Sequence, residues 1–215
     1  MRSDKLLVIL SLINYKKGTL NNRVPFAFSN CPNQMQKKEI AMELKGRKTM
    51  VMVEQMYNDY EFVYPYYRLL EAGAHVDVVA PEAKKTYPGK GGTTATSSLA
   101  AKDAVPGDYA GIVIPGGFAP DFMRRHEAMV NLVREMFNQG KVVAAICHGG
   151  WMLASARILQ DKKVTSFFAI KDDLIHAGAN WVDEEVVVDK NLITSRTPDD
   201  LPAFMRAALE GMSRI

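Results

Sequence analysis

From residue 49 onward, short apolar runs of strand length alternate with segments whose apolar side chains recur at helical spacing. The apolar runs predict strands at residues 49–53, 75–80, 111–114 and 142–146, and a late hairpin at 185–188 and 192–195. Helical spacing predicts helices at 61–72, between Pro120 and Gly140, at 151–159 and at 201–212. This alternation is typical of an α/β domain whose mostly parallel sheet has helices on both faces.

The charge divides unevenly between this patterned region and the residues before it. Residues 1–48 hold ten Lys and Arg against three Asp and Glu, whereas residues 49–215 hold seventeen against twenty-one. Because residues 14–38 show no sustained periodicity, we expect residues 1–48 to be a disordered basic leader. A translation start assigned too early is the alternative, since Met42 and Met50 lie next to the first strand. The excess charge comes without a recognisable binding motif, so we expect no nucleic-acid partner.

Cysteine usage and hydropathy indicate the compartment. The two cysteines, Cys31 and Cys147, cannot form a disulfide framework, and nothing else in the chain demands an oxidising environment. Residues 6–13 are mostly apolar, but a membrane-spanning helix needs about 20 such residues. No small-residue cleavage site follows this run, which disfavours a signal peptide. We therefore expect a cytoplasmic protein without a membrane partner.

Cys147 is the strongest candidate for chemistry. The strand at 142–146 runs directly into it, and small residues and a helix follow. A strand–turn–helix of this kind presents a nucleophile at the edge of a sheet, and a thiol at a helix N-terminus favours the thiolate. The alternative is a small buried hydrophobic residue. The adjacent His148 favours catalysis, although we expect a residue one position further on not to fold back comfortably to act as the base.

Two other strand ends are candidates, because ligands of an open parallel sheet bind outside the carboxyl ends of its strands. Residues 114–117, Ile-Pro-Gly-Gly, offer backbone N–H groups to an oxyanion beside the thiol, or form a plain turn. Glu61 begins the first helix and would enter the same cleft, where its carboxyl can tune a thiolate. The alternative for Glu61, and for Glu127 in the following helix, is a charge that solvates a first helical turn.

No set of His, Cys and acidic residues has metal-ligand spacing. Residues 87–92, Tyr-Pro-Gly-Lys-Gly-Gly, are typical turn residues and predict a hairpin-like excursion over the surface. The glycine-rich part, residues 89–92, lacks the Lys-Ser/Thr pair of a phosphate-binding loop. We therefore expect neither a metal nor a cofactor.

Together, five sequence motifs resemble the ThiJ/PfpI family, within the class I glutamine-amidotransferase-like superfamily, and the similarity covers about residues 49–212. The motifs are Ala145-Ile146-Cys147-His148-Gly149, Ile114-Pro115-Gly116-Gly117, Glu61-Phe62-Val63-Tyr64-Pro65, Ile170-Lys171-Asp172-Asp173 and Asn180-Trp181-Val182-Asp183. The resemblance implies a flavodoxin-like three-layer sandwich over residues 49–215, with a nucleophile elbow at Cys147.

The resemblance also implies roles for the candidate residues. Glu61 matches the acid that hydrogen-bonds the cysteine, and Gly117 and His148 match the oxyanion-hole donors. His148 matches a histidine whose partner glutamate comes from a neighbouring subunit, and Glu127 is at the matching position. The implied assembly is therefore a homo-oligomer, either a dimer or an assembly of the hexamer-of-dimers type. Asn58 departs from the family pattern, in which an acid stands there.

The activities that the resemblance implies are deglycase, glyoxalase and intracellular cysteine peptidase, all through a covalent intermediate on Cys147. A small cleft beside a subunit contact favours small aldehydes or glycated adducts over folded proteins. We therefore expect a stress-related deglycase or glyoxalase, with peptidase as the first alternative. An alternative of another class is a redox sensor or chaperone, in which Cys147 is oxidised beside Glu61. Glutamine amidotransferase activity is disfavoured, because the only later histidine is His176, which we interpret as a helix-surface side chain.

Overall fold

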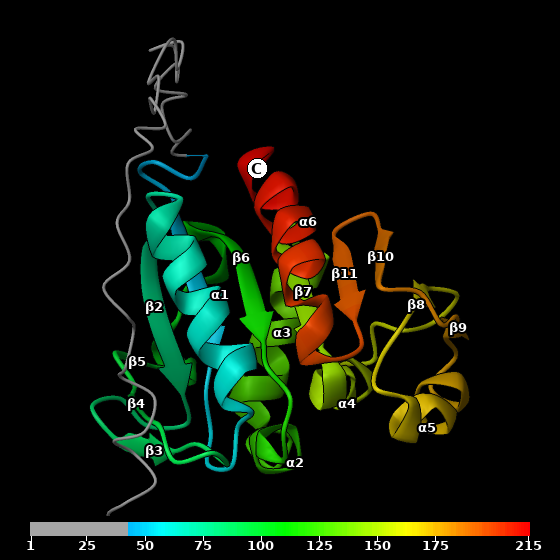
Figure 1. Cartoon of the computed structure of the whole chain (residues 1–215). Coiled ribbons are helices and arrows are strands. Elements are labelled where there is room, and N and C mark those ends of the chain that lie inside the picture. Colours follow the sequence, from blue (N-terminus) through cyan, green and yellow to red (C-terminus); the bar gives the residue numbers. More distant parts are fainter. Residues whose placement is uncertain (1–42) are drawn as a thin grey trace, which may run out of the picture. The chain divides into compact units, whose positions relative to one another are not determined.

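A seven-stranded sheet forms the centre of the molecule. The computed structural model describes residues 43–215, and its strands follow the order β10-β11-β7-β6-β1-β2-β5 (Figure 1). Neighbouring strands are parallel except β10 and β11, which are antiparallel. The strands are β1 Lys48–Met52, β2 His75–Ala80, β5 Leu99–Ala100, β6 Tyr109–Ile114, β7 Val142–Ile146, β10 Val186–Asp189 and β11 Leu192–Ser195. The predicted strands and the late hairpin are confirmed.

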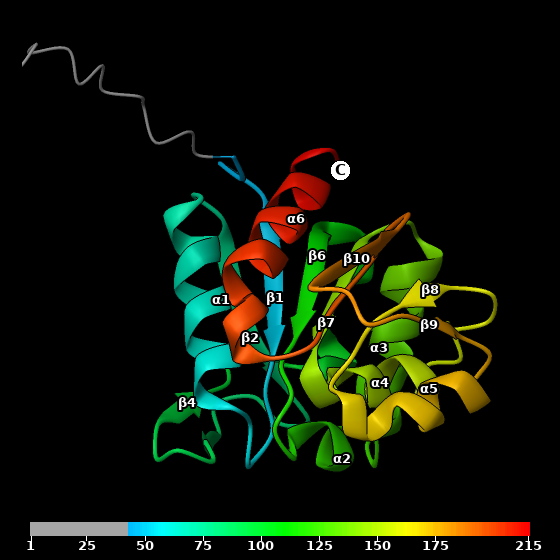
Figure 2. The same cartoon turned by 45° about the vertical axis from the view of Figure 1, so that its right-hand side comes forward.

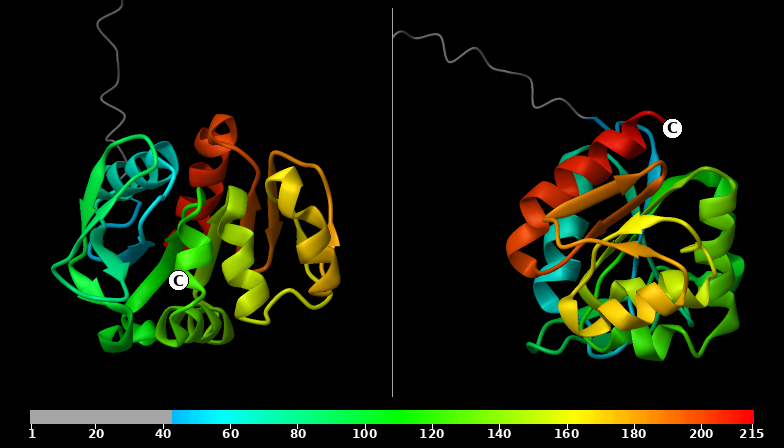
Figure 3. Two further views of the ribbon diagram at one scale, coloured as in Figure 1. Left: turned by 90° about the horizontal axis from the view of Figure 1, so that it is seen from below. Right: turned by 90° about the vertical axis from the view of Figure 1, so that its right-hand side faces the viewer.

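Helices cover both faces of this sheet. Helices α1 (Asp59–Glu71) and α6 (Leu201–Ser213) pack on one face, and α3 (Glu127–Asn138) and α4 (Gly150–Ser155) pack on the other. The side view in Figure 3 shows α6 and α3 on opposite sides of the sheet. Strands β6 and β7 are buried at every position, which explains their continuous apolar sequence. The α/β class and the flavodoxin-like three-layer arrangement are confirmed.

Two predicted helices are shorter than expected. The helix expected between Pro120 and Gly140 is two helices, α2 (Ala119–Met123) and α3, because the backbone of His126 is extended between them. The helix expected at 151–159 ends at Ser155, and Arg157 then adopts a left-handed conformation with φ +58°. Neither interruption has a glycine or proline to mark it in the sequence.

Two small two-stranded sheets lie outside the seven-stranded sheet. Strands β3 (Thr86–Pro88) and β4 (Thr94–Thr96) form an antiparallel hairpin, which confirms the excursion predicted from the turn residues at 87–92. The two-residue strands β8 (Lys163–Val164) and β9 (Asn180–Trp181) pair beside helix α5 (Lys171–His176), as Figure 2 shows. His176 is exposed at the end of α5, as predicted.

The folded region begins earlier than the sequence indicates. The sequence predicts that residues 43–48 belong to the leader, yet the Leu44 side chain is fully buried and its N–H donates to the Ala72 carbonyl at 2.9 Å. The assignment of these residues to a disordered leader is therefore wrong, since they pack against the end of α1. The prediction for residues 1–42 lies outside the described residues. Within residues 43–215, no helix is long and apolar enough to cross a bilayer.

Candidate active site

The thiol of Cys147 lies at the carboxyl end of β7, on a strained turn. Cys147 has φ +60°, in the left-handed region that side chains other than glycine rarely adopt, and a short 3-10 turn, Cys147–Gly149, connects it to α4. Gly149 has no room for a side chain, because a Cβ atom there would lie 2.6 Å from the Ile114 carbonyl oxygen. The backbone of the turn is thus fixed against the end of β6. The Cys147 residue is 7% exposed.

His148 folds back onto the thiol. Its Nδ1 atom lies 3.2 Å from the Cys147 Sγ atom, so the expectation that His148 would not fold back comfortably onto the thiol is wrong. The positive φ at Cys147 turns the chain and makes the contact possible. The imidazole stacks on Phe167, with ring centroids 5.0 Å apart, and meets Trp151 edge-on. Burial and the nearby charge of Lys90 lower the pKa of His148, which favours the neutral ring that can accept a proton.

Glu61 brings a buried carboxyl to the same place from the first turn of α1. The residue is fully buried, and its Oε2 atom accepts a hydrogen bond from the Gly116 N–H at 2.7 Å. Burial raises the pKa of Glu61 to about 7, against the lowering effect of hydrogen bonds from Gly116 and Cys147. Burial, and then the charge of Glu61, raise the pKa of the Cys147 thiol to about 12. The carboxyl and the thiol therefore titrate as a coupled pair, and a protonated Glu61 favours the thiolate.

Two backbone N–H groups are directed at the sulfur. Those of Gly117 and His148 hydrogen-bond to Cys147 and favour its ionised form. Gly117 has φ +76°, and a Cβ atom there would lie 2.5 Å from both the Met56 carbonyl oxygen and the Asn58 nitrogen, so only glycine fits. Both donors therefore lie beside the candidate nucleophile.

Glu127 does not join this group within one chain. It is exposed at the start of α3, and it borders a separate cavity of about 550 Å³ that also contains four arginines. The arginines are Arg124, Arg125, Arg134 and Arg157. The role of Glu127 in a neighbouring subunit's site stays a prediction.

A cavity of about 160 Å³ opens onto the thiol. It is lined by Asn58, Glu61, Lys90, Gly117, Phe118, Cys147, His148, Phe167 and Pro198. Sequence reasoning missed Lys90, Phe118, Phe167 and Pro198 as lining residues. Lys90 lies in the glycine-rich turn and Phe118 directly follows Gly117, so proximity to recognised features was an available signal for these two residues. No such signal marks Phe167 or Pro198.

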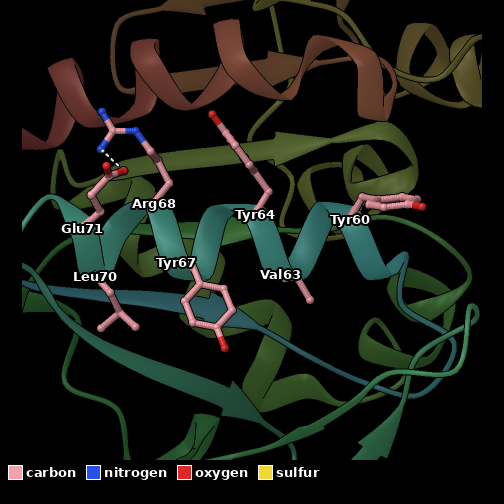
Figure 4. A pocket seen from close by; sticks show the side chains of 7 residues that line it. All are labelled: Tyr60, Val63, Tyr64, Tyr67, Arg68, Leu70 and Glu71. Carbon is pink, nitrogen blue, oxygen red and sulfur yellow. Dashed lines mark ion pairs between the residues drawn. The ribbon is translucent and has the colours of Figure 1, made fainter. Parts of the chain in front are cut away.

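A second apolar cavity lies on the exposed side of α1, away from the chemistry. Its volume is about 780 Å³, and Figure 4 shows its aromatic side chains on the helix surface. It is lined by Tyr60, Val63, Tyr64, Tyr67, Arg68, Leu70 and Glu71. No cysteine, histidine or candidate catalytic acid lines this groove. Within residues 43–215, no three His, Cys, Asp or Glu side chains converge as metal ligands.

Comparison with known proteins agrees with this geometry. Residues 47–211 match the model of the DJ-1/PfpI family. This chain belongs to the DJ-1/PfpI family. A deglycase of Pyrococcus abyssi is 43% identical over 159 residues, which cover 74% of this chain and 95% of the deglycase. Protein/nucleic acid deglycase 2 of Escherichia coli is 40% identical over 166 residues, which cover 76% of this chain and 96% of that protein.

A solved DJ-1/PfpI structure gives the same result for the fold. A two-domain protein of Anabaena variabilis, with DJ-1/ThiJ/PfpI-like and ferritin-like domains, superposes with a TM-score of 0.75 at 41% identity. The match covers 76% of this chain and 47% of the two-domain protein, so this chain spans about half of its length. The resemblance to the ThiJ/PfpI family and the prediction of a cysteine-dependent enzyme are confirmed.

Proposed function

We propose that this protein is a cysteine-dependent hydrolase that acts on methylglyoxal-type aldehydes or on the glycation adducts they form. The observation that carries the proposal is the contact of 3.2 Å between Cys147 Sγ and His148 Nδ1 at the base of a small cavity. Relatives at 40–43% identity are named deglycases. A cavity of about 160 Å³ suits a small aldehyde or a single modified side chain.

The residues support one sequence of steps on methylglyoxal. His148 accepts the thiol proton, the sulfur attacks the aldehyde carbon, and the carbonyl π electrons move to oxygen, beside the N–H groups of Gly117 and His148. Protonation of that oxygen gives a thiohemiacetal. His148 then moves the proton from the former aldehyde carbon to the ketone carbon, and the hydroxyl proton of the thiohemiacetal passes to the ketone oxygen. The first carbon becomes a carbonyl and the second carries a hydroxyl, which gives a thioester of lactate. Water cleaves the carbon–sulfur bond, releasing lactate and the thiol.

Glu61 supports these steps through the sulfur. A carboxyl whose pKa is about 7 is partly protonated at neutral pH, and its proton can be shared with the thiolate. We assign it to positioning and tuning Cys147. The peptidase alternative needs a peptide to reach a cavity of about 160 Å³, which disfavours folded substrates. The redox-sensor alternative uses the same cysteine and acid but gives no role to the contact with His148.

Catalysis should also depend on assembly. We propose a homo-oligomer in which Glu127 of one subunit approaches the free ring nitrogen of His148 in its neighbour. The support is that His148 Nδ1 faces the sulfur and Glu127 is exposed. We further propose that the protein is cytoplasmic, because two cysteines in the sequence are too few for a disulfide framework.

Methylglyoxal consumption and casein hydrolysis, measured in parallel on the wild type and on Cys147→Ser, test the proposed activity. We expect methylglyoxal consumption to fall to background in Cys147→Ser. Cys31→Ser, outside the family-matched residues, is the control and should keep full activity. Unchanged consumption in Cys147→Ser would exclude Cys147 as the nucleophile, and casein hydrolysis without methylglyoxal consumption would favour the peptidase.

Subunit mixing tests the role of Glu127. Cys147→Ser and Glu127→Ala should each be inactive, yet a mixed dimer contains one site with both an intact Cys147 and an intact Glu127 from the other chain. Random mixing in equal amounts should therefore recover about a quarter of wild-type activity. If the isolated Glu127→Ala protein is fully active, or the mixture stays inactive, the role of Glu127 across subunits is excluded.

A further inference from the structure

Lys90 is the one lysine or arginine among the residues that line the Cys147 cavity. The carboxyl of Glu61 lines the same cavity, but it is fully buried and bonded to the Gly116 N–H. Lys90 is exposed, and none of the ion pairs formed within residues 43–215 includes it. The cavity thus presents a cation whose charge is not neutralised by a neighbouring side chain.

The turn between β3 and β4 holds Lys90 in place. The Lys90 N–H donates to the Tyr57 carbonyl at 2.8 Å. One oxygen of the Asp59 carboxylate accepts from the Thr93 N–H at 2.9 Å and from the Thr93 hydroxyl at 2.6 Å, and the other accepts from the Gly91 N–H. Lys90 therefore projects from a backbone that is anchored to the start of α1, two residues before Glu61.

The ammonium group is close enough to influence the reacting residues. Its Nζ atom lies 6.0 Å from the centre of the Phe118 ring, next to the oxyanion donor Gly117. Its charge contributes to lowering the pKa of both Glu61 and His148. The backbone N–H groups of Gly117 and His148 already serve the attacked carbonyl oxygen, so Lys90 remains available for a different part of the substrate.

We propose that Lys90 is a specificity residue that binds a carboxylate, so that the site prefers aldehydes or aldehyde adducts that carry one. This inference rests on the proposed function, because it requires the cavity to hold an aldehyde bound to Cys147. An aldehyde with an adjacent carboxylate would add to the thiol: the carbon–sulfur bond forms, the carbonyl π bond breaks and the thiol proton ends on the oxygen. Its carboxylate would then lie beside the ammonium group.

Glyoxylate and glyoxylamide form a matched pair of probes, because they differ in charge but hardly in size. Each is titrated for its ability to protect Cys147 from iodoacetamide, with alkylation of the Cys147 peptide followed by mass spectrometry. We expect glyoxylate to protect the wild type at about fivefold lower concentration than glyoxylamide, the advantage of one partly exposed ion pair. This advantage should disappear in Lys90→Met, which keeps an unbranched side chain, and persist in Lys90→Arg.

Lys102→Met removes an exposed lysine outside the cavity and should retain the advantage. Equal protection by the two probes in the wild type, or an advantage that persists in Lys90→Met, would overturn the role of Lys90. So would its loss in Lys102→Met, which would indicate a general effect of net charge. Because the readout is protection of a thiol, it decides the role of Lys90 even if methylglyoxal is not consumed. Whether the protein consumes methylglyoxal tests the proposed function alone and does not bear on the role of Lys90.

Discussion

Replacing Glu61 with Gln should remove a stability penalty that increases with pH. Gln has nearly the same shape, and its carbonyl oxygen can still accept the hydrogen bond from the Gly116 N–H. In the wild type the pKa of Glu61 rises from 4.5 to about 7 on folding, mainly because the carboxyl is buried. The folded state therefore binds this proton more tightly than the unfolded state. The stabilisation is complete below pH 4.5 and is lost as the pH rises through about 7.

The size of the effect follows from that interval. From 4.5 to about 7 is between two and three pH units, and each unit corresponds to about 1.4 kcal/mol, which gives about 3 kcal/mol. The unfolding free energy of Glu61→Gln minus that of the wild type should thus increase by about 3 kcal/mol between pH 4 and pH 8. The thiol of Cys147 contributes little in this range, because its pKa lies at 9.0 or above in both states.

Urea denaturation at fixed protein concentration, repeated from pH 4 to pH 8, measures this difference. Glu82→Gln is the matched control: Glu82 is exposed and its pKa is lowered by Lys85, so its small contribution is lost as the pH falls. The control difference should therefore show no increase with pH. If the Glu61→Gln difference changes by less than about 1 kcal/mol, the carboxyl does not have the raised pKa on which the coupling to Cys147 depends.

Three further substitutions test contacts around the site. Gly117→Ala places a Cβ atom 2.5 Å from backbone atoms at φ +76°. We therefore expect the free energy of unfolding to fall by at least about 2 kcal/mol in thermal denaturation, together with a loss of turnover. An unchanged melting temperature would show that the backbone around Gly117 is not packed this closely. Asp59→Ala removes three hydrogen bonds to the β3–β4 turn, so hydrogen exchange at the Thr93 amide should accelerate about tenfold or more. An unchanged exchange rate would show that contacts other than those of Asp59 hold the turn. Arg196→Met leaves the buried Asp200 carboxylate without its bidentate partner and should lower the free energy of unfolding in urea by about 2 kcal/mol. A change near zero would mean that water takes the place of the arginine at this carboxylate.

Much of the sheet could be predicted because strands that are buried on both faces consist of consecutive apolar residues. β6 and β7 are covered on both faces, and their uninterrupted apolar runs identify them. The break between α2 and α3 could not be predicted, since the residues at the break are compatible with a helix and only packing of the two segments separates them. Strands β8 and β9 have two residues each, too few for any periodicity to emerge.

The candidate site divides in the same way. Cys147 was predictable because a strand, small residues and a helix follow one another in the sequence. Its contact with His148 was not, because it depends on a positive φ at a residue that carries a side chain. Lys90 lies far from Cys147 in the sequence, and only the course of the β3–β4 hairpin brings it to the cavity.

The close backbone contacts of Gly117 and Gly149 constrain one part of the site, whereas another part is free to change in sequence. A Cβ atom at Gly117 would meet the backbone of residues 56–58, and one at Gly149 would meet the end of β6. The turns on either side of the thiol are therefore packed closely against neighbouring backbone. Lys90, by contrast, is carried by a small hairpin that is not part of the seven-stranded sheet. Descendants of this chain could therefore replace the residue at position 90, and so acquire another substrate preference, while the reacting atoms stay where they are.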